Sequence, residues 1–265
     1  MTDEVIDGVV YNFVGSRKGP VIVLIHGLGL NKDMWQYQLA DLQKNYCVLT
    51  YDLFGHGLSE TSKEEPSLTM FTEQLNKLLN SLEISEVVLV GFSLGGMIAR
   101  HFSQTYPKKV FALVIFNSPH TRKTEAQDAV LKRYHQVSQL GPESTVEDAI
   151  NRWLTGPFVN DNQDKVNLIR SWVLANKHDI YSKNYLILVD GVKEVVGKIG
   201  RINCPTLVIT GEEDYGNGPE MAKSIADEIQ GAEVIILKGL RHMALFEDPI
   251  QMNKYLNNFL KKTLI

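Results

Sequence analysis

A serine lies between glycines where an apolar run gives way to a helical pattern. The run Val87–Val90 is followed directly by GFSLGG (91–96) and then by an apolar helical stretch at 97–106. A sharp turn between a strand and a helix exposes a serine hydroxyl and crowds the positions two residues before and after it, which accounts for Gly91 and Gly95. The pattern predicts that Ser93 is a nucleophile at a helix N-terminus.

An acid and a histidine follow two later apolar runs. Thr206–Thr210 is followed by GEED (211–214), and Val234–Leu237 is followed shortly by GLRH (239–242). The carboxyl ends of parallel strands meet at one edge of a sheet, so Ser93, Asp214 and His242 should lie together. We expect His242 to act as general base and Asp214 to orient it. The rival acids, Glu212 and Glu213, are interpreted as solvated loop charges.

Backbone groups next to this constellation could hold the negative charge of a reacting carbonyl oxygen. We expect the N–H of Leu94, which follows the nucleophile, and the N–H of Leu28, in the loop after an early strand, to form an oxyanion hole. Six further side chains or backbone positions are candidates for lining a substrate pocket: His26, Gly27, Phe92, His120, Trp153 and Met243. For His120 and Trp153 a packing role is favoured over a pocket role. The remaining histidines, His56, His101, His135 and His178, are assigned to turns, packing or surface.

The elements that would position these residues alternate along the chain. Continuous apolar runs rich in β-branched residues are typical of parallel strands that are covered on both faces. They are Val21–Ile25, Cys47–Tyr51, Val87–Val90, Val110–Phe116, Thr206–Thr210 and Val234–Leu237, with Val9–Val14 as an expected antiparallel edge strand. Apolar residues at 68, 71, 75, 78 and 82 predict an amphipathic helix. Asp248 and Pro249 predict the start of the last helix, whose apolar face would carry Met252, Leu256, Phe259 and Leu260.

The alternation stops between about Thr121 and Ile202, where the sequence is helical in character and holds no convincing strand. An insertion of this size between two strands predicts a helical cap. The expected organisation is therefore an α/β core of residues 1–120 and 203–265 with a cap of residues 121–202. The fold class is α/β, with a mostly parallel sheet.

Composition excludes several other functions. The net charge of −4 and the pI near 6.0 give no basic excess to recruit nucleic acid or an anionic membrane. The polar, acidic start lacks the pattern of a signal peptide, and no apolar run approaches a membrane span. Cys47 and Cys204 are interpreted as reduced structural thiols of a cytoplasmic protein, and no spacing suggests a metal site.

Five sequence blocks, in this order, resemble the α/β-hydrolase fold superfamily: HGLG (26–29), DLFGHGLS (52–59), GFSLGG (91–96), GEED (211–214) and HMALFEDP (242–249). The sequence looks closest to small capped carboxylesterases, enol-lactone hydrolases and carbon–carbon bond hydrolases. The resemblance implies an eight-stranded sheet, a helical cap after the sixth strand, no cofactor, and a small ester or lactone as substrate. We expect a monomer or a homodimer.

Several residues depart from the pattern of this superfamily, and two of these departures bear on the alternative activities. Ser93 replaces the aspartate nucleophile of dehalogenases and epoxide hydrolases, which argues against both activities. Met243 follows the histidine where carbon–carbon hydrolases often carry Trp, which weakens that reading. Phe54 replaces a usual Arg or Pro, and Arg241 a usual Gly. The leading hypothesis is hydrolysis of a small carboxylic ester or lactone through an acyl-enzyme; the alternatives are a carbon–carbon bond hydrolase and a hydrolase-fold receptor for a small molecule.

Overall fold

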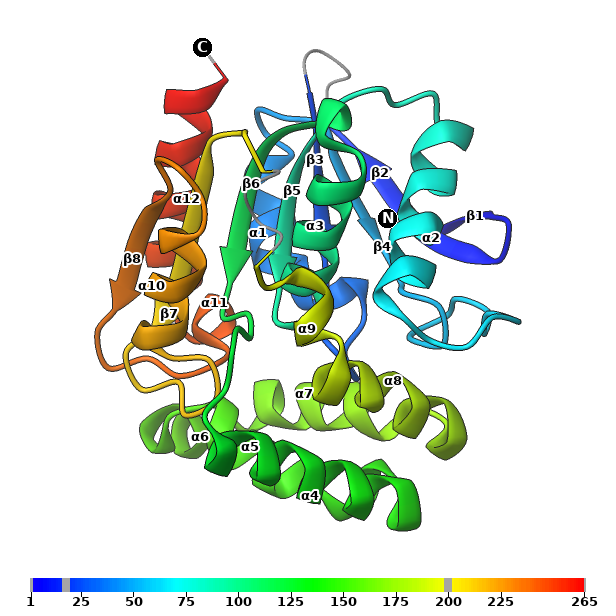
Figure 1. Cartoon of the computed structure of the whole chain (residues 1–265), viewed down its shortest axis with the longest axis vertical. Coiled ribbons are helices and arrows are strands. Elements are labelled where there is room, and N and C mark those ends of the chain that lie inside the picture. The colour runs from blue at the N-terminus through cyan, green and yellow to red at the C-terminus, as the bar shows by residue number, and fades with distance from the viewer. Residues whose placement is uncertain (1, 16–19, 198–201, 265) are drawn as a thin grey trace.

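An eight-stranded sheet runs through the middle of the protein (Figure 1). This computed structural model describes residues 2–15, 20–197 and 202–264. The strands are β1 (Glu4–Ile6), β2 (Val9–Val14), β3 (Val21–Ile25), β4 (Val48–Tyr51), β5 (Val87–Phe92), β6 (Val110–Phe116), β7 (Thr206–Gly211) and β8 (Glu233–Leu237). They lie in the order β1-β2-β4-β3-β5-β6-β7-β8. Neighbouring strands from β4 to β8 are parallel, whereas β1–β2 and β2–β4 are antiparallel, so the predicted mostly parallel sheet is confirmed.

The antiparallel end of the sheet corrects one prediction. Val9–Val14 is antiparallel as expected, but it is not the edge strand, because β1 pairs with its outer side. Asp7 and Gly8 connect the two strands with positive φ angles of 48° and 75°, the conformation of a tight hairpin turn. β1 has only three residues and is largely exposed, so it carries no hydrophobic signal, although the Asp-Gly pair is a hairpin signal.

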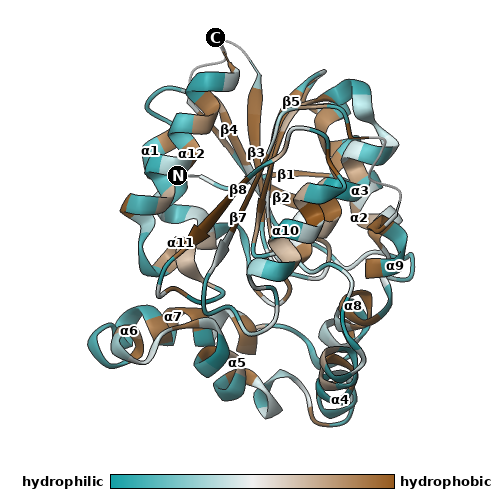
Figure 2. Cartoon of the chain, turned by 60° about the vertical axis from the view of Figure 1, so that its left-hand side comes forward, coloured by the Kyte–Doolittle hydropathy of each residue, from teal (hydrophilic) through white to brown (hydrophobic). Residues whose placement is uncertain are grey.

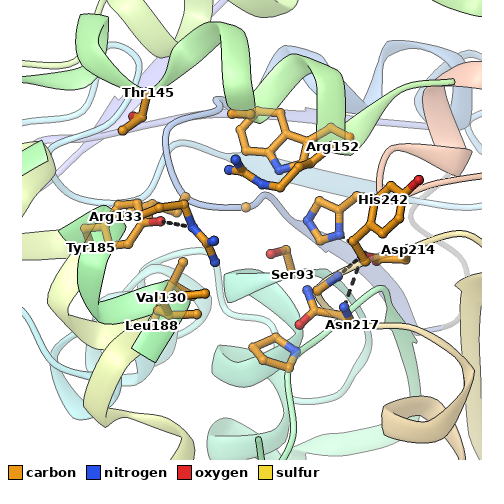
Figure 3. A pocket seen from close by; sticks show the side chains of 18 of the residues that line it. Ser93, Val130, Arg133, Thr145, Arg152, Tyr185, Leu188, Asp214, Asn217 and His242 are labelled. Carbon is orange, nitrogen blue, oxygen red and sulfur yellow. Dashed lines mark hydrogen bonds and ion pairs between the residues drawn. The ribbon is translucent and has the colours of Figure 1, made fainter. Parts of the chain in front are cut away.

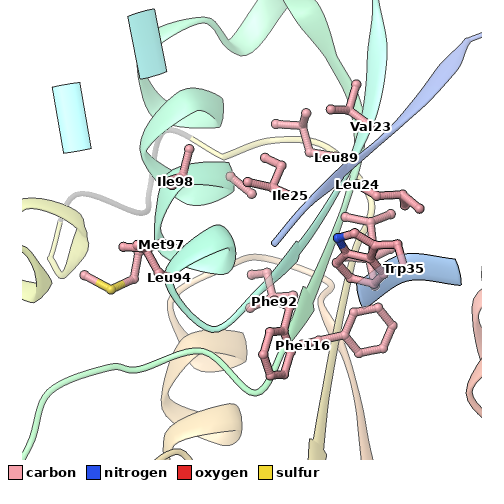
Figure 4. Packing of buried hydrophobic residues seen from close by; sticks show 14 of the residues in the cluster. Val23, Leu24, Ile25, Trp35, Leu89, Phe92, Leu94, Met97, Ile98 and Phe116 are labelled. Atoms are coloured by element: carbon pink, nitrogen blue, oxygen red, sulfur yellow. The ribbon is translucent and has the colours of Figure 1, made fainter. Parts of the chain in front are cut away.

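The central strands form the core of the protein. All four residues of Val87–Val90 and all of 22–25 are 0% exposed, because helices cover both faces of the sheet. In Figure 4, Leu24 of β3 lies beside Trp35 and Phe92 of β5 beside Phe116, whereas Ile25 and Leu89 lie on the side of Ile98. Apolar residues accordingly gather along the strands in Figure 2, whereas β8, at the other edge, is partly exposed.

Helices cover the two faces of the sheet, as the edge-on view in Figure 2 shows. On one face lie α2 (Leu68–Ser81), α3 (Leu94–Thr105) and α10 (Pro219–Asp227). On the other lie α1 (Gln36–Leu42) and α12 (Pro249–Thr263), which contact each other, and the short α11 (Ala244–Glu247) precedes α12. The predicted start of α12 is confirmed, because the side chain of Asp248 accepts a hydrogen bond from the Gln251 N–H at 3.0 Å.

A helical insertion separates β6 from β7. It contains α4 (Thr124–Leu140), α5 (Val146–Trp153), α6 (Gly156–Asp161), α7 (Gln163–Leu174), α8 (His178–Asp190) and α9 (Val192–Val195). Figures 1 and 2 place α4 to α8 beyond the carboxyl ends of the parallel strands. The position after the sixth strand is as predicted. The division into a core and a cap of residues 121–202 stays a prediction, and residues 198–201 lie outside the described residues.

Candidate active site

Ser93 lies at the turn between β5 and α3 in a strained conformation. Its φ of 53° and ψ of −112° place a non-glycine residue in a region that L-residues rarely adopt. A Cβ at Gly91 would lie 2.2 Å from the carbonyl oxygen of Gly95, and a Cβ at Gly95 would lie 2.1 Å from that of Ile25. The turn therefore requires both glycines, for the reason inferred from the sequence. It presents Ser93 at the N-terminus of α3.

The loop after β3 lies against Ser93. A Cβ at Gly27 would lie 3.3 Å from the Cβ of Ser93 and 2.9 Å from the ring of Phe92. Within the described part of the chain, the backbone N–H groups of Leu28 and Leu94 have no protein acceptor. Both predicted oxyanion donors are therefore available for a ligand oxygen.

His242 and Asp214 form a buried hydrogen-bonded pair. Nδ1 of His242 lies 2.7 Å from Oδ2 of Asp214, and the two side chains are 8% and 3% exposed. The interaction leaves Nε2 of His242 as the ring nitrogen that can exchange a proton with a substrate or nucleophile. The ring of His242 packs against Phe92 and Trp153, at centroid distances of 4.9 and 6.1 Å.

The carboxylate of Asp214 accepts hydrogen bonds at both oxygens. Oδ2 also accepts from Nδ2 of Asn117 at 2.8 Å, and Oδ1 accepts from the backbone N–H groups of Gly216 and Asn217 at 3.0 Å each. Burial raises the pKa of Asp214, but the charge of His242 and these hydrogen bonds outweigh burial, so the pKa lies below its usual value. Asp214 is thus an anion that is held in one orientation.

Asn117 is a site residue that the sequence analysis missed. It follows β6 directly with a positive φ of 47°, which turns its amide toward Asp214 and Thr210. Its backbone carbonyl accepts a hydrogen bond from the side chain of Asn217. Asn117 and Asp214 are 97 positions apart in the sequence, so no local pattern connects them.

The two alternative acids, Glu212 and Glu213, have partners other than His242. Oε2 of Glu212 accepts from the backbone N–H of Gly239, and Glu213 pairs with Arg241 at 3.6 Å; both glutamates are exposed. Arg241 donates hydrogen bonds to the carbonyl oxygens of Asn151 and Leu154 at 2.8 and 2.9 Å. It thereby joins the histidine loop to the end of α5.

Ser93, Asp214 and His242 line a single pocket of about 230 Å³. Figure 3 shows the Ser93 side chain and the His242 ring facing the same space. Among the predicted pocket and oxyanion residues, the structure places Gly27, Leu28, Phe92 and Trp153 in the wall. Trp153, for which the sequence favours a packing role, instead reaches the pocket from the end of α5, in contact with the ring of His242.

Three predicted pocket residues lie elsewhere. His26 is 0% exposed; its Nε2 accepts a hydrogen bond from the Leu53 N–H at 3.0 Å, and burial lowers its pKa to about 4. His120 turns away to Glu228, 3.1 Å from its Nε2, and burial lowers its pKa. Met243 is also 0% exposed and joins the core. All three are structural because each is enclosed by neighbouring elements.

The insertion contributes pocket residues that the sequence analysis did not single out. Three are cationic, namely Arg122, Arg133 and Arg152, and two are the tyrosines Tyr181 and Tyr185. The signal available in the sequence was weak, because arginines on amphipathic helices usually face solvent. Only the packing of α4, α5 and α8 turns these side chains toward Ser93.

Among residues 2–15, 20–197 and 202–264, no group of three or more His, Cys, Asp or Glu side chains is placed to hold a metal ion. In the same ranges, no helix combines the length and the apolarity that crossing a bilayer requires.

Comparison with known proteins identifies the family. The model of the alpha/beta hydrolase fold family matches residues 20–249. The chain belongs to this family. It is 26% identical, over 93% of its length and 92% of the relative, to the (E)-2-((N-methylformamido)methylene)succinate hydrolase of Acinetobacter baylyi. It is 25% identical to 3-oxoadipate enol-lactonase 2 of the same organism, over 95% of this chain and 92% of the relative.

Solved structures superpose on nearly the whole chain. The enol-lactonase from Burkholderia xenovorans has a TM-score of 0.88 at 24% identity, with 98% of this chain and 100% of that chain covered. A thermophilic esterase from Thermogutta terrifontis also has a TM-score of 0.88, at 22% identity, with 97% and 94% covered. At these identities the superpositions establish the α/β-hydrolase fold.

Proposed function

We propose that this protein is a serine hydrolase that cleaves a small carboxylic ester or lactone through an acyl-enzyme. One observation carries the proposal: Ser93, held in a strained turn, shares a pocket with the hydrogen-bonded pair of His242 and Asp214. A hydroxyl becomes a useful nucleophile only when it is exposed beside a base. The base here is oriented by an acid whose other hydrogen bonds are satisfied.

The first half of the reaction forms the acyl-enzyme. Oγ of Ser93 attacks the carbonyl carbon while Nε2 of His242 accepts the hydroxyl proton. The negative charge that develops on the carbonyl oxygen is stabilised by the N–H groups of Leu28 and Leu94, and by the N-terminus of α3. The C–O bond of the ester then breaks, and His242 returns the proton to the departing alcohol oxygen.

The second half of the reaction regenerates the serine. Water attacks the acyl carbon, and Nε2 of His242 accepts one of its protons. The bond between the carbonyl carbon and Oγ breaks, and His242 delivers the proton to Ser93. Asp214 stabilises the imidazolium in both halves because it is an anion next to Nδ1.

The size of the pocket and the relatives support a small ester or lactone. A cavity of about 230 Å³ suits a compact substrate rather than a long acyl chain. One of the curated relatives carries the name 3-oxoadipate enol-lactonase, which supports a lactone among the substrates.

The nucleophile can be tested with 4-nitrophenyl acetate in a stopped-flow experiment. We expect a burst of 4-nitrophenolate equal to the enzyme concentration, followed by slower turnover. Ser93→Ala should lose the burst, lower turnover by about 10⁴-fold or more, and no longer react with a fluorophosphonate probe. Ser103→Ala is the matched control, because Ser103 lies on the same helix and donates its hydroxyl to the carbonyl of Ala99. Equal turnover by wild type and Ser93→Ala would refute the proposal.

A further inference from the structure

The pocket carries an excess of positive charge opposite Ser93. Arg122 precedes α4, Arg133 lies within α4, and Arg152 lies near the end of α5; all three line the pocket and are half-buried. Figure 3 shows Arg133 and Arg152 reaching into the space that Ser93 and His242 face. The three charges are therefore collected from two helices and a connecting segment into one small volume.

Protein carboxylates balance these charges weakly: the charge of Asp148, four positions before Arg152, opposes the lowering of the Arg152 pKa, but burial and the charge of Arg133 outweigh it. In the described ranges, none of the three arginines forms an ion pair with Asp or Glu. Asp214 is the one acidic side chain among the residues that line the pocket, and it is already bound to His242. The excess is local, because the whole chain has a net charge of −4.

The arginines also repel one another. Burial lowers the pKa of Arg122 to about 10, with a further contribution from the charge of Arg133. Burial likewise lowers the pKa of Arg152, and the charge of Arg133 is again the next cause. Like charges that share a partly desolvated space are unfavourable unless an anion joins them. The site is thus electrostatically incomplete without a negatively charged ligand.

All three guanidinium groups retain N–H donors with no acceptor among the described residues, and Arg122 makes the most hydrogen bonds of the three. Nη1 of Arg122 donates to the carbonyl oxygen of Leu188 at 2.7 Å, so this arginine is partly occupied in holding α8. Arg133 uses only Nε, which donates to the hydroxyl of Tyr185 at 3.3 Å. This hydrogen bond orients the Arg133 guanidinium and leaves its two Nη groups for a ligand. No hydrogen bond from the Arg152 guanidinium to another described residue is present.

We infer that Arg133 and Arg152 bind a carboxylate of the substrate, so that this enzyme acts on esters or lactones of acids that carry a second carboxyl group. The inference rests on the proposed hydrolase function and narrows its substrate class. A guanidinium matches a carboxylate with two parallel hydrogen bonds, which is the geometry that arginine favours over lysine. A half-ester of a short dicarboxylic acid, such as glutaric acid, suits a pocket of about 230 Å³.

The test compares two substrates of equal length that differ in the second carboxylate. Monomethyl glutarate carries it, and methyl pentanoate replaces it with a methyl group; hydrolysis of both is followed by titration of released protons. Wild type should hydrolyse monomethyl glutarate with a kcat/KM higher by about tenfold or more, since a site built to bind a polar group rejects an analogue that lacks it. In Arg133→Gln and in Arg152→Gln, the ratio of the two kcat/KM values should fall by about tenfold.

The matched control is Arg170→Gln, which removes a half-buried arginine of the same insertion that pairs with Glu147 and does not line the pocket. In Arg170→Gln, the ratio of the kcat/KM values for the two esters should equal that of wild type. A binding measurement keeps the test independent of turnover: glutarate should bind to Ser93→Ala in a calorimeter, and Arg133→Gln in that background should weaken binding about tenfold.

The outcomes separate the two proposals. Efficient hydrolysis of methyl pentanoate, with no preference for the half-ester, would overturn the carboxylate site and leave the hydrolase intact. No hydrolysis of either ester, or of 4-nitrophenyl acetate, would instead overturn the proposed function. Displacement of glutarate by an equal concentration of inorganic phosphate would overturn the assignment to carboxylates and indicate a general anion site.

Discussion

At the scale of single residues, the site depends on how one carboxylate is held. Asp214 is buried and accepts hydrogen bonds from His242, from Asn117 and from two backbone N–H groups. The backbone donors fix the carboxylate plane, and Asn117 and His242 share one oxygen. Because a buried charge is costly unless each lone pair is used, these contacts explain why an anion is tolerated there.

Asp214→Asn should lower activity at all pH values, but should lower stability in a pH-dependent way. The neutral amide no longer stabilises an imidazolium, so kcat for 4-nitrophenyl acetate should fall by about 10⁴-fold with the fold retained. The folded pKa of Asp214 is below its usual value, so its stabilisation is present above about pH 4 and is lost as the pH falls through the folded pKa. The difference in unfolding free energy between wild type and Asp214→Asn should therefore narrow below about pH 4.

Urea unfolding at several pH values measures this difference. Asp227→Asn, on the exposed face of α10, provides a control that should match wild type in both activity and stability. A stability difference that grows as the pH falls would contradict the assignment of a depressed pKa.

At the scale of elements, α12 shows how local chemistry defines a boundary. Asp248 accepts a hydrogen bond from the Gln251 N–H, Pro249 occupies the first turn, and the face with Met252 and Leu256 is fully buried. Asn253 on the same helix donates to the carbonyl oxygen of Tyr37, within α1, at 3.1 Å. The N-terminal capping residue of α12, Asp248, therefore contributes to the layer of helices that covers this face of the sheet.

Removal of the Asp248 side chain from the start of α12 should lower the stability of the fold without changing the hydrolytic activity. Asp248→Ala should lower the unfolding free energy by about 1 kcal/mol, and Asp248→Ser should restore most of it, because a serine can accept the same hydrogen bond. Thermal and urea unfolding measure the effect, and Lys254→Ala, exposed on the same helix, is the control. A loss with Asp248→Ser as large as with Asp248→Ala would show that the hydrogen bond is not the source.

At the scale of the whole molecule, the central sheet and helix α4 differ in how deeply their side chains are buried. The sheet core is fully buried, whereas α4 buries only Val130 and Val137 of its 17 residues. Yet α4 supplies Arg133, and α5 supplies Arg152 and Trp153, to the pocket. The exposed side chains of α4 can therefore vary with little effect on the core, whereas α5, α7 and α8 bury apolar residues that belong to it.

Hydrogen exchange followed by mass spectrometry should show this difference between the sheet core and α4. Amides of β3, β5 and β6 should exchange slowest, because they open only with global unfolding, and peptides of α4 should exchange earlier through local opening. Peptides of α12 serve as an internal comparison on the core side. Protection of α4 amides for as long as β5 amides would contradict the predicted difference in local stability.

Local sequence was sufficient to predict the scaffold and to place the proposed catalytic residues at one edge of the sheet. The strands, the glycines around Ser93 and the capped start of α12 follow from hydrophobic periodicity and turn chemistry, which act over a few neighbouring residues. The elements then bring Ser93, Asp214 and His242 to one edge of the sheet, since parallel strands share their carboxyl ends. The short strand β1 was missed because three exposed residues carry too little hydrophobic pattern.

The walls of the pocket were decided by tertiary packing. His26, His120 and Met243 look like pocket residues from their place in the chain, but contacts with Leu53, Glu228 and Trp153 turn them into the interior. Asn117, Arg133 and Arg152 have no local signature, because their roles arise from neighbours distant in the sequence. Periodicity specifies which face of an element is apolar; which polar side chain meets which ligand depends on how separate elements pack.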